Sequence, residues 1–385
     1  MINTFTKLVF KGQRNFRKMS TSSQYVTEVL KVDPTSIDFD IQDRLTISDP
    51  ITEQNLTKAA QILSKSTQIV AFPSETVYGL GGNSFNDDSI RNIYKAKNRP
   101  SDNPLISHIS SISQIPRLFN VELPEIYKPL IEKFWPGPLT ILIPNLPDSK
   151  ISSLTTAGQS TIAIRLPSHP IARALIHLAD VPVAAPSANA STRPSPTQAA
   201  HVYHDLEGKV PLILDGGPSD VGVESTVIDG LSNPPILLRP GGVSLEEIKK
   251  IGGELWKDVR VAKKLADDSD EPVKTPGMKY KHYSPTAKVI LVSDESKILE
   301  YIKIHDLNDK KLALLTSQHF KGDSFDGIVD SLGRTKKEVS TNLFKLLRHL
   351  DEDLSVDYIF VESVDIADEG LAIMNRLQKA ASETI

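Results

Sequence analysis

Cysteine is absent from the 385-residue sequence. Its absence excludes disulfide bonds, a thiolate nucleophile and metal sites with cysteine ligands. The sequence also lacks any apolar run near the ~20 residues needed to cross a bilayer, so we expect a soluble protein without a membrane partner. An excess of positive charge is missing too, because the formal net charge is −4 at pH 7. We therefore expect no large electrostatic surface for nucleic acid.

Acidic residues are missing before Glu28, where lysines and arginines alternate with apolar residues and precede the hydroxyl-rich segment 20–23. This composition is typical of a mitochondrial presequence, and a disordered basic tail has the same features. We interpret residues 1–48 as a basic N-terminal extension. Initiation at Met19 would remove the basic segment. We therefore expect a cytoplasmic protein with a mitochondrial form made from the longer start.

The length of the chain favours two domains. Between residues 262 and 285 the composition becomes charged, proline-containing and poor in aliphatic side chains. We interpret 262–285 as an interdomain linker, preceded by a catalytic domain at 49–261 and followed by a C-terminal domain at 286–385. The last hundred residues alternate strand-like and helical segments, which predicts a small parallel α/β sheet. They contain no G-x-G-x-x-G or Walker pattern, so we infer no second nucleotide site there.

The segment from Ile69 to Ile109 combines a short apolar strand with unusual polar residues. Strand-forming residues end at Pro73 and lead into a glycine-rich turn, which allows backbone to approach a ligand closely. An amphipathic helix follows, which we expect Asp87 or Asp88 to cap.

Three cations gather at the exit of this helix, namely Lys95, Lys97 and Arg99. One lysine needs no functional explanation, because a helix C-terminus attracts cations. Three cations within five residues favour a site for polyphosphate or carboxylate, which lysine meets as a point charge and arginine as a bidentate fork. We expect Lys97 and Arg99 to be exposed.

The segment STIAIRLP at 160–167 predicts a strand with two different faces. With a period of two, Ile162 and Ile164 face one side, and Arg165 faces the other. An exposed arginine on a half-buried sheet and a ligand-binding arginine fit this pattern equally well. Arg239 is the last residue of another apolar strand. It could be an ordinary turn residue before Pro240, but an arginine at the end of an apolar strand is better placed to bind phosphate.

Short β-like runs at 211–217, 224–230 and 235–242 end in glycine-rich turns. Together with the helical segments between the earlier strands, they predict a twisted mixed α/β sheet. We expect its strand ends and turns to line one cavity.

Several of these motifs, in this order, resemble the YrdC/Sua5 family of threonylcarbamoyl-AMP synthases. They are SETVYGLG, the Lys97-x-Arg99 pair, Asn103-Pro104-Leu105, His108, the SxN sequence at 187–189 and the linker run PGMKYKHYSP. The resemblance implies a two-domain Sua5-type enzyme with a YrdC-like catalytic domain and a smaller, Rossmann-like C-terminal Sua5 domain.

The resemblance implies a nucleotidyltransferase that converts L-threonine, bicarbonate or CO₂, and ATP into L-threonylcarbamoyladenylate and pyrophosphate. This is the first stage of t6A formation at position 37 of tRNAs that read ANN codons. It implies Mg²⁺ bound with ATP, and transfer of the product to a separate tRNA threonylcarbamoyl transferase. RNA would be unnecessary for adenylate formation. The ligands of the metal are unknown from the sequence.

The resemblance also assigns roles to individual residues. Lys97 and Arg99 would stabilise the charge of the transition state. L-threonine would contact Thr76, His108, Arg165, Ala185 and Ser225. ATP would contact Arg99, Asn103, Thr161, Ser187, Ser195, Arg239 and one of the linker tyrosines, Tyr280 or Tyr283.

Two other functions remain open. A YrdC-type cavity used to bind double-stranded RNA or tRNA without catalysis would suit the cations, but the acidic net charge and the lack of aromatic-basic repeats count against it. Carbamoyl transfer from carbamoyl phosphate to a protein would require an acceptor domain and zinc-finger cysteines, and cysteine is absent.

The N-terminal segment yields a first prediction. Residues 1–30 fused to a fluorescent reporter should direct it to mitochondria when translation starts at Met1. The same fusion starting at Met19 should stay in the cytoplasm, because it lacks the basic residues that a presequence needs. A cytoplasmic signal from the longer fusion would contradict the dual localisation.

Overall fold

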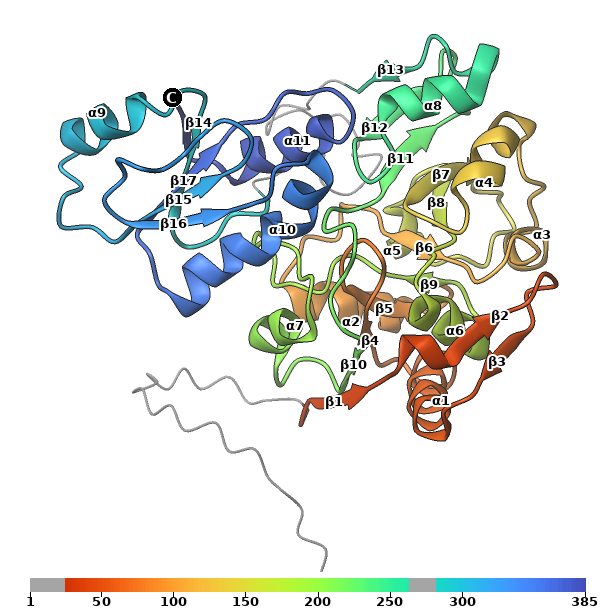
Figure 1. Ribbon diagram of the computed structural model, residues 1–385. Helices are drawn as coiled ribbons and strands as arrows, with labels where there is room; N and C mark the ends of the chain where they lie inside the picture. Colours follow the sequence, from red (N-terminus) through yellow and green to blue (C-terminus); the bar gives the residue numbers. More distant parts are fainter. Residues whose placement is uncertain (1–24, 263–281) are drawn as a thin grey trace, which may run out of the picture.

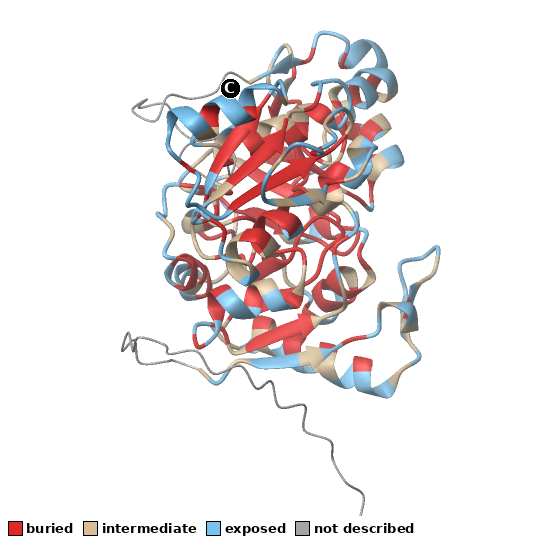
Figure 2. Cartoon of the chain, turned by 60° about the vertical axis from the view of Figure 1, so that its left-hand side comes forward, coloured by how far each residue is buried: buried red, intermediate tan, exposed pale blue. Residues whose placement is uncertain are grey.

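The computed structural model describes residues 25–262 and 282–385. Figure 1 shows a larger N-terminal domain beside a smaller C-terminal one. Each is built on a β-sheet whose strands are largely buried (Figure 2). Both sheets carry helices, so the predicted α/β class is confirmed. None of the helices in the described ranges is long and apolar enough to cross a membrane.

Among the described residues, the larger domain contains an 11-stranded sheet with parallel and antiparallel pairs, which confirms the predicted mixed sheet. In sheet order its strands are β1 (Glu28–Lys31), β10 (Leu212–Asp215), β4 (Val70–Phe72), β5 (Gly79–Asn83), β9 (Val183–Ala184), β6 (Ile106–His108), β8 (Thr161–Arg165), β7 (Leu139–Pro144), β11 (Thr226–Asp229), β12 (Ile236–Arg239) and β13 (Arg260–Val261).

Helices cover both faces of this sheet because its buried strands carry apolar residues at successive positions. On one face α1 (Pro50–Lys65) and α6 (Pro170–Ala179) pack on Val70 and Phe72. On the other, α2 (Asp87–Lys97) and α7 (Ala199–Leu206) pack on Ala71 and Ile213. Successive side chains of a strand point to opposite faces of the sheet, so each strand contributes apolar residues to two separate cores.

The remaining elements of the larger domain pack against this sheet or against its helices. They are the hairpin of β2 (Ile37–Phe39) and β3 (Leu45–Ile47), α3 (Gln114–Phe119), α4 (Lys128–Phe134), α5 (Ser153–Thr156), α8 (Leu245–Gly252) and the 3₁₀ turns Pro34–Ser36, Glu125–Tyr127 and Gly253–Leu255. A third core lies under α3, α4 and α8, and it contains Ile162 and Ile164 of β8. The predicted apolar face of this strand is confirmed.

Two expectations near the N-terminus are wrong. Strand β1 pairs with β10, so the sheet already includes residues that we assigned to the N-terminal extension at 1–48. The cap of α2 is Asn86, whose side chain accepts a hydrogen bond from the backbone of Ser89 at 2.9 Å. Asp87 and Asp88 lie instead in the first turn, where their charge still favours the helix dipole.

The C-terminal domain contains a five-stranded sheet within the described part of the chain, and all its strand pairs are parallel. In sheet order the strands are β16 (Ile328–Ser331), β15 (Leu312–Thr316), β17 (Tyr358–Glu362), β14 (Lys288–Val292) and β18 (Glu383–Thr384). Its helices are α9 (Lys297–Ile304), α10 (Lys336–Arg348), continued by the π-helical turn His349–Asp353, and α11 (Gly370–Ala380). The predicted small parallel α/β sheet is confirmed.

Helices α10 and α11 face the larger domain, whereas α9 covers the opposite side of the C-terminal sheet. The core under α10 and α11 includes Val77 from the larger domain, so one apolar cluster spans both domains. The hydroxyl of Ser340 in α10 donates to the carbonyl oxygen of Val221 at 2.7 Å. The domains therefore form a continuous packed interface.

Gly222 lies at this interface with a positive φ of 79°. A Cβ atom there would lie 2.3 Å from the carbonyl oxygen of Ser340 and 2.5 Å from the Cα of Thr341. Only a residue without a side chain allows α10 to approach this closely.

We predict that Gly222→Ala lowers the free energy of unfolding by about 2–4 kcal/mol, because backbone strain and overpacking add. Gly217→Ala is the matched control, since Gly217 has a similar φ of 89° and open space around its Cβ position. That variant should lose only about 1 kcal/mol. Chemical unfolding measures both, and equal losses would contradict the close contact.

Candidate active site

A cavity with a volume of about 70 Å³ lies beside the ends of β4, β8 and β12, near the C-terminal domain. Most of the predicted site residues line it, namely Thr76, Lys97, Arg99, His108, Arg165, Ala185, Ser187, Ser225, Arg239 and Tyr283. These residues come from separate parts of the chain, and the fold brings them together.

Four predicted residues are placed differently. Asn103, Thr161 and Ser195 do not belong to the cavity lining in the described residues, and Tyr280 lies outside the described residues. Asn103 is buried beside Arg99, and Thr161 is the half-buried first residue of β8. Ser195 is buried behind the cavity wall, where its hydroxyl donates to Glu224.

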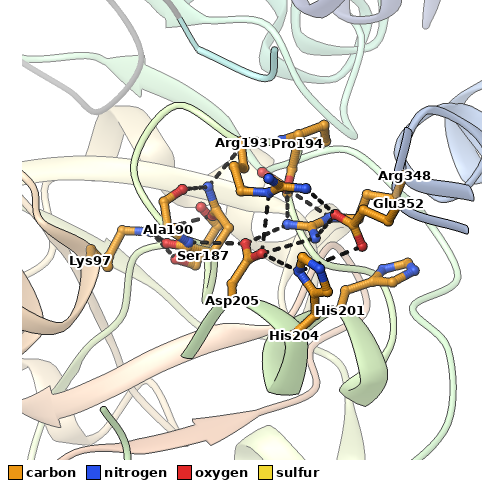
Figure 3. A network of polar contacts seen from close by, with 12 residues as sticks. Lys97, Ser187, Ala190, Arg193, Pro194, His201, His204, Asp205, Arg348 and Glu352 are labelled. Atoms are coloured by element: carbon orange, nitrogen blue, oxygen red, sulfur yellow. Dashed lines mark hydrogen bonds and ion pairs between the residues drawn. The ribbon is translucent and has the colours of Figure 1, made fainter. Parts of the chain in front are cut away.

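Lys97 ends α2, and its ammonium group lies against the loop that follows β9 (Figure 3). Nζ donates to the carbonyl oxygens of Ser187 and Asn189, the latter at 2.6 Å, and lies 3.3 Å from the side-chain oxygen of Asn189. All three donors of the ammonium group thus have an acceptor.

The expected exposure of the two basic residues is wrong. Lys97 is only 3% exposed, and Arg99 is half-buried, because the loop after β9 folds over the end of α2. Burial, with the nearby charge of Arg99, lowers the pKa of Lys97 well below its usual value. A bound anion would offset this loss of hydration.

Arg99 lines the cavity and has a hydrogen-bond donor that is not used within the described part of the chain. Among the described residues its Nε has no hydrogen-bond partner, and Nη2 makes a long contact of 3.5 Å to the carbonyl oxygen of Asn103. Burial lowers the pKa of Arg99. A guanidinium whose buried Nε has no partner in the described part of the chain is suited to a phosphate or carboxylate.

Arg165 points from β8 into the cavity, as the alternation of the strand predicts, and it is held there from three sides. Nη2 lies 2.6 Å from Oε1 of Glu75, Nη1 donates to the hydroxyl of Thr76 at 3.0 Å, and Nε donates to the carbonyl oxygen of Gly137 at 3.2 Å. Burial alone would raise the pKa of Glu75, but Arg165 lowers it below the usual value. The guanidinium is therefore oriented before any ligand binds.

His108 is a neutral residue of the cavity wall. Burial, followed by the charge of Arg165, lowers its pKa to about 3. Nδ1 lies 3.1 Å from the carbonyl oxygen of Ile106 and 3.2 Å from that of Val183, so a proton on Nδ1 suits these acceptors. An imidazole with so low a pKa is a poor general base at neutral pH.

Arg239 closes β12 and packs against Ser225. Its Nη2 donates to the carbonyl oxygen of Ser225 at 2.8 Å and to the hydroxyl at 3.1 Å, and this hydroxyl also lies 2.8 Å from that of Thr140. Burial lowers the pKa of Arg239 to about 10, so it stays charged at neutral pH.

The loop after β9 is also held by the C-terminal domain (Figure 3). Arg348 of α10 donates to the carbonyl oxygen of Pro194 at 2.6 Å and to Asp205 at 2.7 Å. The same oxygen, Oδ2 of Asp205, also accepts from the backbone N–H of Ala190 at 3.0 Å, so Asp205 connects Arg348 to the loop. Arg193 pairs with Glu352 at 2.6 Å.

This group of charges is better explained as an ion-pair network than as a metal centre. His204, Asp205 and Glu352 place ligand atoms within 4.8 Å of one another. The guanidinium groups of Arg193 and Arg348 already neutralise both carboxylates, so a cation would gain little there.

Tyr283 belongs to the predicted linker and lines the cavity, as does His282. The ring of Tyr283 stacks on Phe344 of α10, with 5.3 Å between ring centroids and 29° between planes. This part of the linker thus connects the cavity to the C-terminal domain. Burial lowers the pKa of His282 to about 4, so this ring is neutral as well.

Two family profiles match the chain. The profile named "Telomere recombination" matches residues 63–241. The profile named "Threonylcarbamoyl-AMP synthase, C-terminal domain" matches residues 243–382. A threonylcarbamoyl-AMP synthase of Schizosaccharomyces pombe is 48% identical over 88% of this chain and 91% of that protein. One of Bacillus subtilis is 45% identical over 89% of this chain and 96% of that protein. The chain belongs to the Sua5 family of threonylcarbamoyl-AMP synthases.

The fold agrees with that of a solved Sua5 protein. Pyrococcus abyssi Sua5, solved in complex with L-threonine, matches with a TM-score of 0.79 and 40% identity. The match covers 93% of this chain and 99% of that chain. The similarity therefore includes both domains of the Sua5 arrangement.

The sequence motifs did not indicate Glu224, which lines the cavity of this Sua5-family protein, or Arg376, which pairs with it. Glu224 lines the cavity and accepts hydrogen bonds from Ser195 and, at 2.8 Å, from Arg376 of α11. The sequence does contain an indication that Arg376 is buried, because this residue lies between Ile373 and Leu377 on the apolar face of its helix. An arginine within such a stripe indicates a buried partner.

We predict that Lys97→Met lowers the free energy of unfolding by about 1–3 kcal/mol, since buried carbonyl oxygens lose their donor. It should also reduce the synthase reaction roughly 100-fold, because the cavity loses a cation. Lys95→Met is the control, as Lys95 is exposed on the same helix and should change stability by less than about 0.5 kcal/mol. Chemical unfolding and pyrophosphate release measure the two effects. Unchanged stability of Lys97→Met would contradict its anchoring role.

Proposed function

We propose that the protein synthesises L-threonylcarbamoyladenylate from L-threonine, bicarbonate or CO₂, and ATP. One observation carries the proposal: Arg99, Arg165 and Arg239, from distant parts of the sequence, line a single cavity. Three guanidinium groups there suit two anionic substrates bound side by side. Membership of the Sua5 family supports the same activity, and so does the complex of P. abyssi Sua5 with L-threonine.

In this proposal Arg165 receives the carboxylate of threonine. Its contacts with Glu75, Thr76 and Gly137 fix the plane of the guanidinium, and Nη1 and Nη2 each keep a second N–H group for the substrate. Thr76 and Ser225 offer hydroxyl groups, and Ala185 leaves room for the substrate's methyl group. Neutral His108 adds a polar wall without adding charge.

Arg99, Arg239 and Lys97 would meet the triphosphate of ATP. Glu224 is a carboxylate of the cavity wall, but its oxygens are taken by Ser195 and Arg376. We therefore propose that Mg²⁺ enters as the substrate complex Mg–ATP, held by phosphate oxygens and water, as is common for this ion.

The proposed chemistry has two steps. The amino nitrogen of threonine bonds to the carbon of CO₂ and loses a proton, which gives a carbamate. A carbamate oxygen then bonds to the α-phosphorus of ATP, while the bond from that phosphorus to the β-bridging oxygen breaks and pyrophosphate leaves with the electron pair. Buried cations stabilise the charge that develops on the phosphoryl oxygens and the leaving group. No side-chain nucleophile is required.

Binding of double-stranded RNA without catalysis fits the site less well. The cations of the cavity are buried or half-buried and face a small enclosed space. Recognition of a duplex requires basic residues along an open surface that follows the phosphate backbone.

The product is a mixed anhydride, which a nucleophile attacks readily. We propose that it passes to a separate transferase for t6A formation on tRNA, with RNA unnecessary for adenylate formation. The basic composition of residues 1–24 supports a further proposal, a mitochondrial form in addition to a cytoplasmic one.

We predict that the pure protein, given Mg²⁺, ATP, labelled bicarbonate and threonine, releases pyrophosphate and forms a labelled adenylate without RNA. Serine should react more slowly, because one methyl group is worth about 1–3 kcal/mol in a fitted pocket. Reactions without bicarbonate serve as the control. Equal rates with serine and threonine would contradict the pocket, and RNA binding without pyrophosphate release would favour the binding module.

A further inference from the structure

Arg376 of α11 is a buried cation that crosses from the C-terminal domain to the cavity wall, and it is 1% exposed. Its Nε donates to Oε2 of Glu224 at 2.8 Å, and its Nη1 donates to the carbonyl oxygen of Pro240 at 2.7 Å. The guanidinium carbon also lies 5.6 Å from the centroid of the Tyr283 ring. One side chain therefore contacts three segments of the larger domain and linker.

Each of these segments carries a residue of the site. Glu224 precedes Ser225 and binds the hydroxyl of Ser195 through its other oxygen. Pro240 follows Arg239, so its carbonyl group is one residue from the guanidinium that we assign to phosphate. Movement of Arg376 would displace these groups together, because each bond is short and buried.

The pair of Arg376 and Glu224 also keeps a carboxylate charged next to an anion site. Burial alone would raise the pKa of Glu224, but Arg376, and after it Arg239, lowers it to about 2. An ionised carboxylate is costly to bury unless it is paired and hydrogen-bonded. Without Arg376, the carboxylate of Glu224 would attract the guanidinium of Arg239, which is the next buried cation that acts on it.

We propose that Arg376 is a positioning residue for ATP, acting through Glu224 and Pro240 to hold Ser195 and Arg239 in place. The inference rests on the proposed function. It makes nucleotide binding depend on a docked C-terminal domain, since the same guanidinium is part of α11. Arg376 itself does not line the cavity and contacts no substrate in this role.

The test measures binding of an ATP analogue with a methylene group between the α- and β-phosphates, by calorimetry on the full chain. Arg376→Met removes the charge and keeps an apolar stem. Arg376→Lys keeps the charge but cannot reach both acceptors, since it lacks the planar fork. Leu314→Ala is the control, because Leu314 is buried in the core under α9, on the far side of the C-terminal sheet. It should destabilise the domain without touching the cavity.

Arg376→Met should weaken analogue binding about tenfold, and threonine binding less than about threefold, whereas Leu314→Ala should change neither. The KM for ATP should rise in parallel. If Arg376→Met does not fold, Arg376→Lys decides, with an expected loss of about threefold or more. Binding as tight as in the unaltered protein, or an equal loss in Leu314→Ala, would overturn the proposal.

A double variant separates positioning from simple loss of packing. In Arg376→Met the unpaired charge of Glu224 remains, so adding Glu224→Gln should recover part of the lost affinity. Losses that simply add would overturn the coupling through Glu224. Failure of the unaltered protein to bind the analogue and release pyrophosphate would instead contradict the proposed function itself.

Discussion

The cavity contains more buried positive charge than buried negative charge, and this imbalance governs the site. Lys97, Arg99, Arg165 and Arg239 line it, opposed by Glu75 and Glu224. Burial lowers the pKa of Lys97, Arg99 and Arg239, because each of these cations has lost hydration. Anionic substrates add favourable charge interactions with these cations, so the buried positive charge favours binding of a triphosphate and a carboxylate.

The regular secondary structure of the larger domain places these cations at the cavity. The pleat of β8 sends Arg165 to one side and its isoleucines to the other, α2 ends at Lys97, and β12 ends at Arg239. A sheet aligns such ends at one edge, which is where ligands usually bind in α/β folds. The second domain then supports the segments behind this wall, because Arg348 of α10 donates to Pro194 and Arg376 of α11 donates to Pro240.

Features that depend on local periodicity could be predicted from the sequence, and features that depend on contacts between distant segments could not. The alternating faces of β8 and the parallel C-terminal sheet follow from residue patterns. Burial of Lys97 depends on a loop almost a hundred residues later, and the pairing of β1 with β10 joins two segments that lie far apart in the sequence. Burial of Arg376 could have been predicted, because the sequence places it within an apolar helical stripe. No such pattern in the sequence predicts that Glu224 is its partner.

Strand β1 limits how far the chain can be shortened from its N-terminus. It shields one edge of β10, whose Leu212 and Leu214 are buried. Cleavage beyond Glu28 would leave the backbone groups of an apolar strand unpaired, and such an edge templates aggregation. Strand β1 is therefore an integral part of the folded domain, and a shortened chain must keep it if the edge of the sheet is to stay covered.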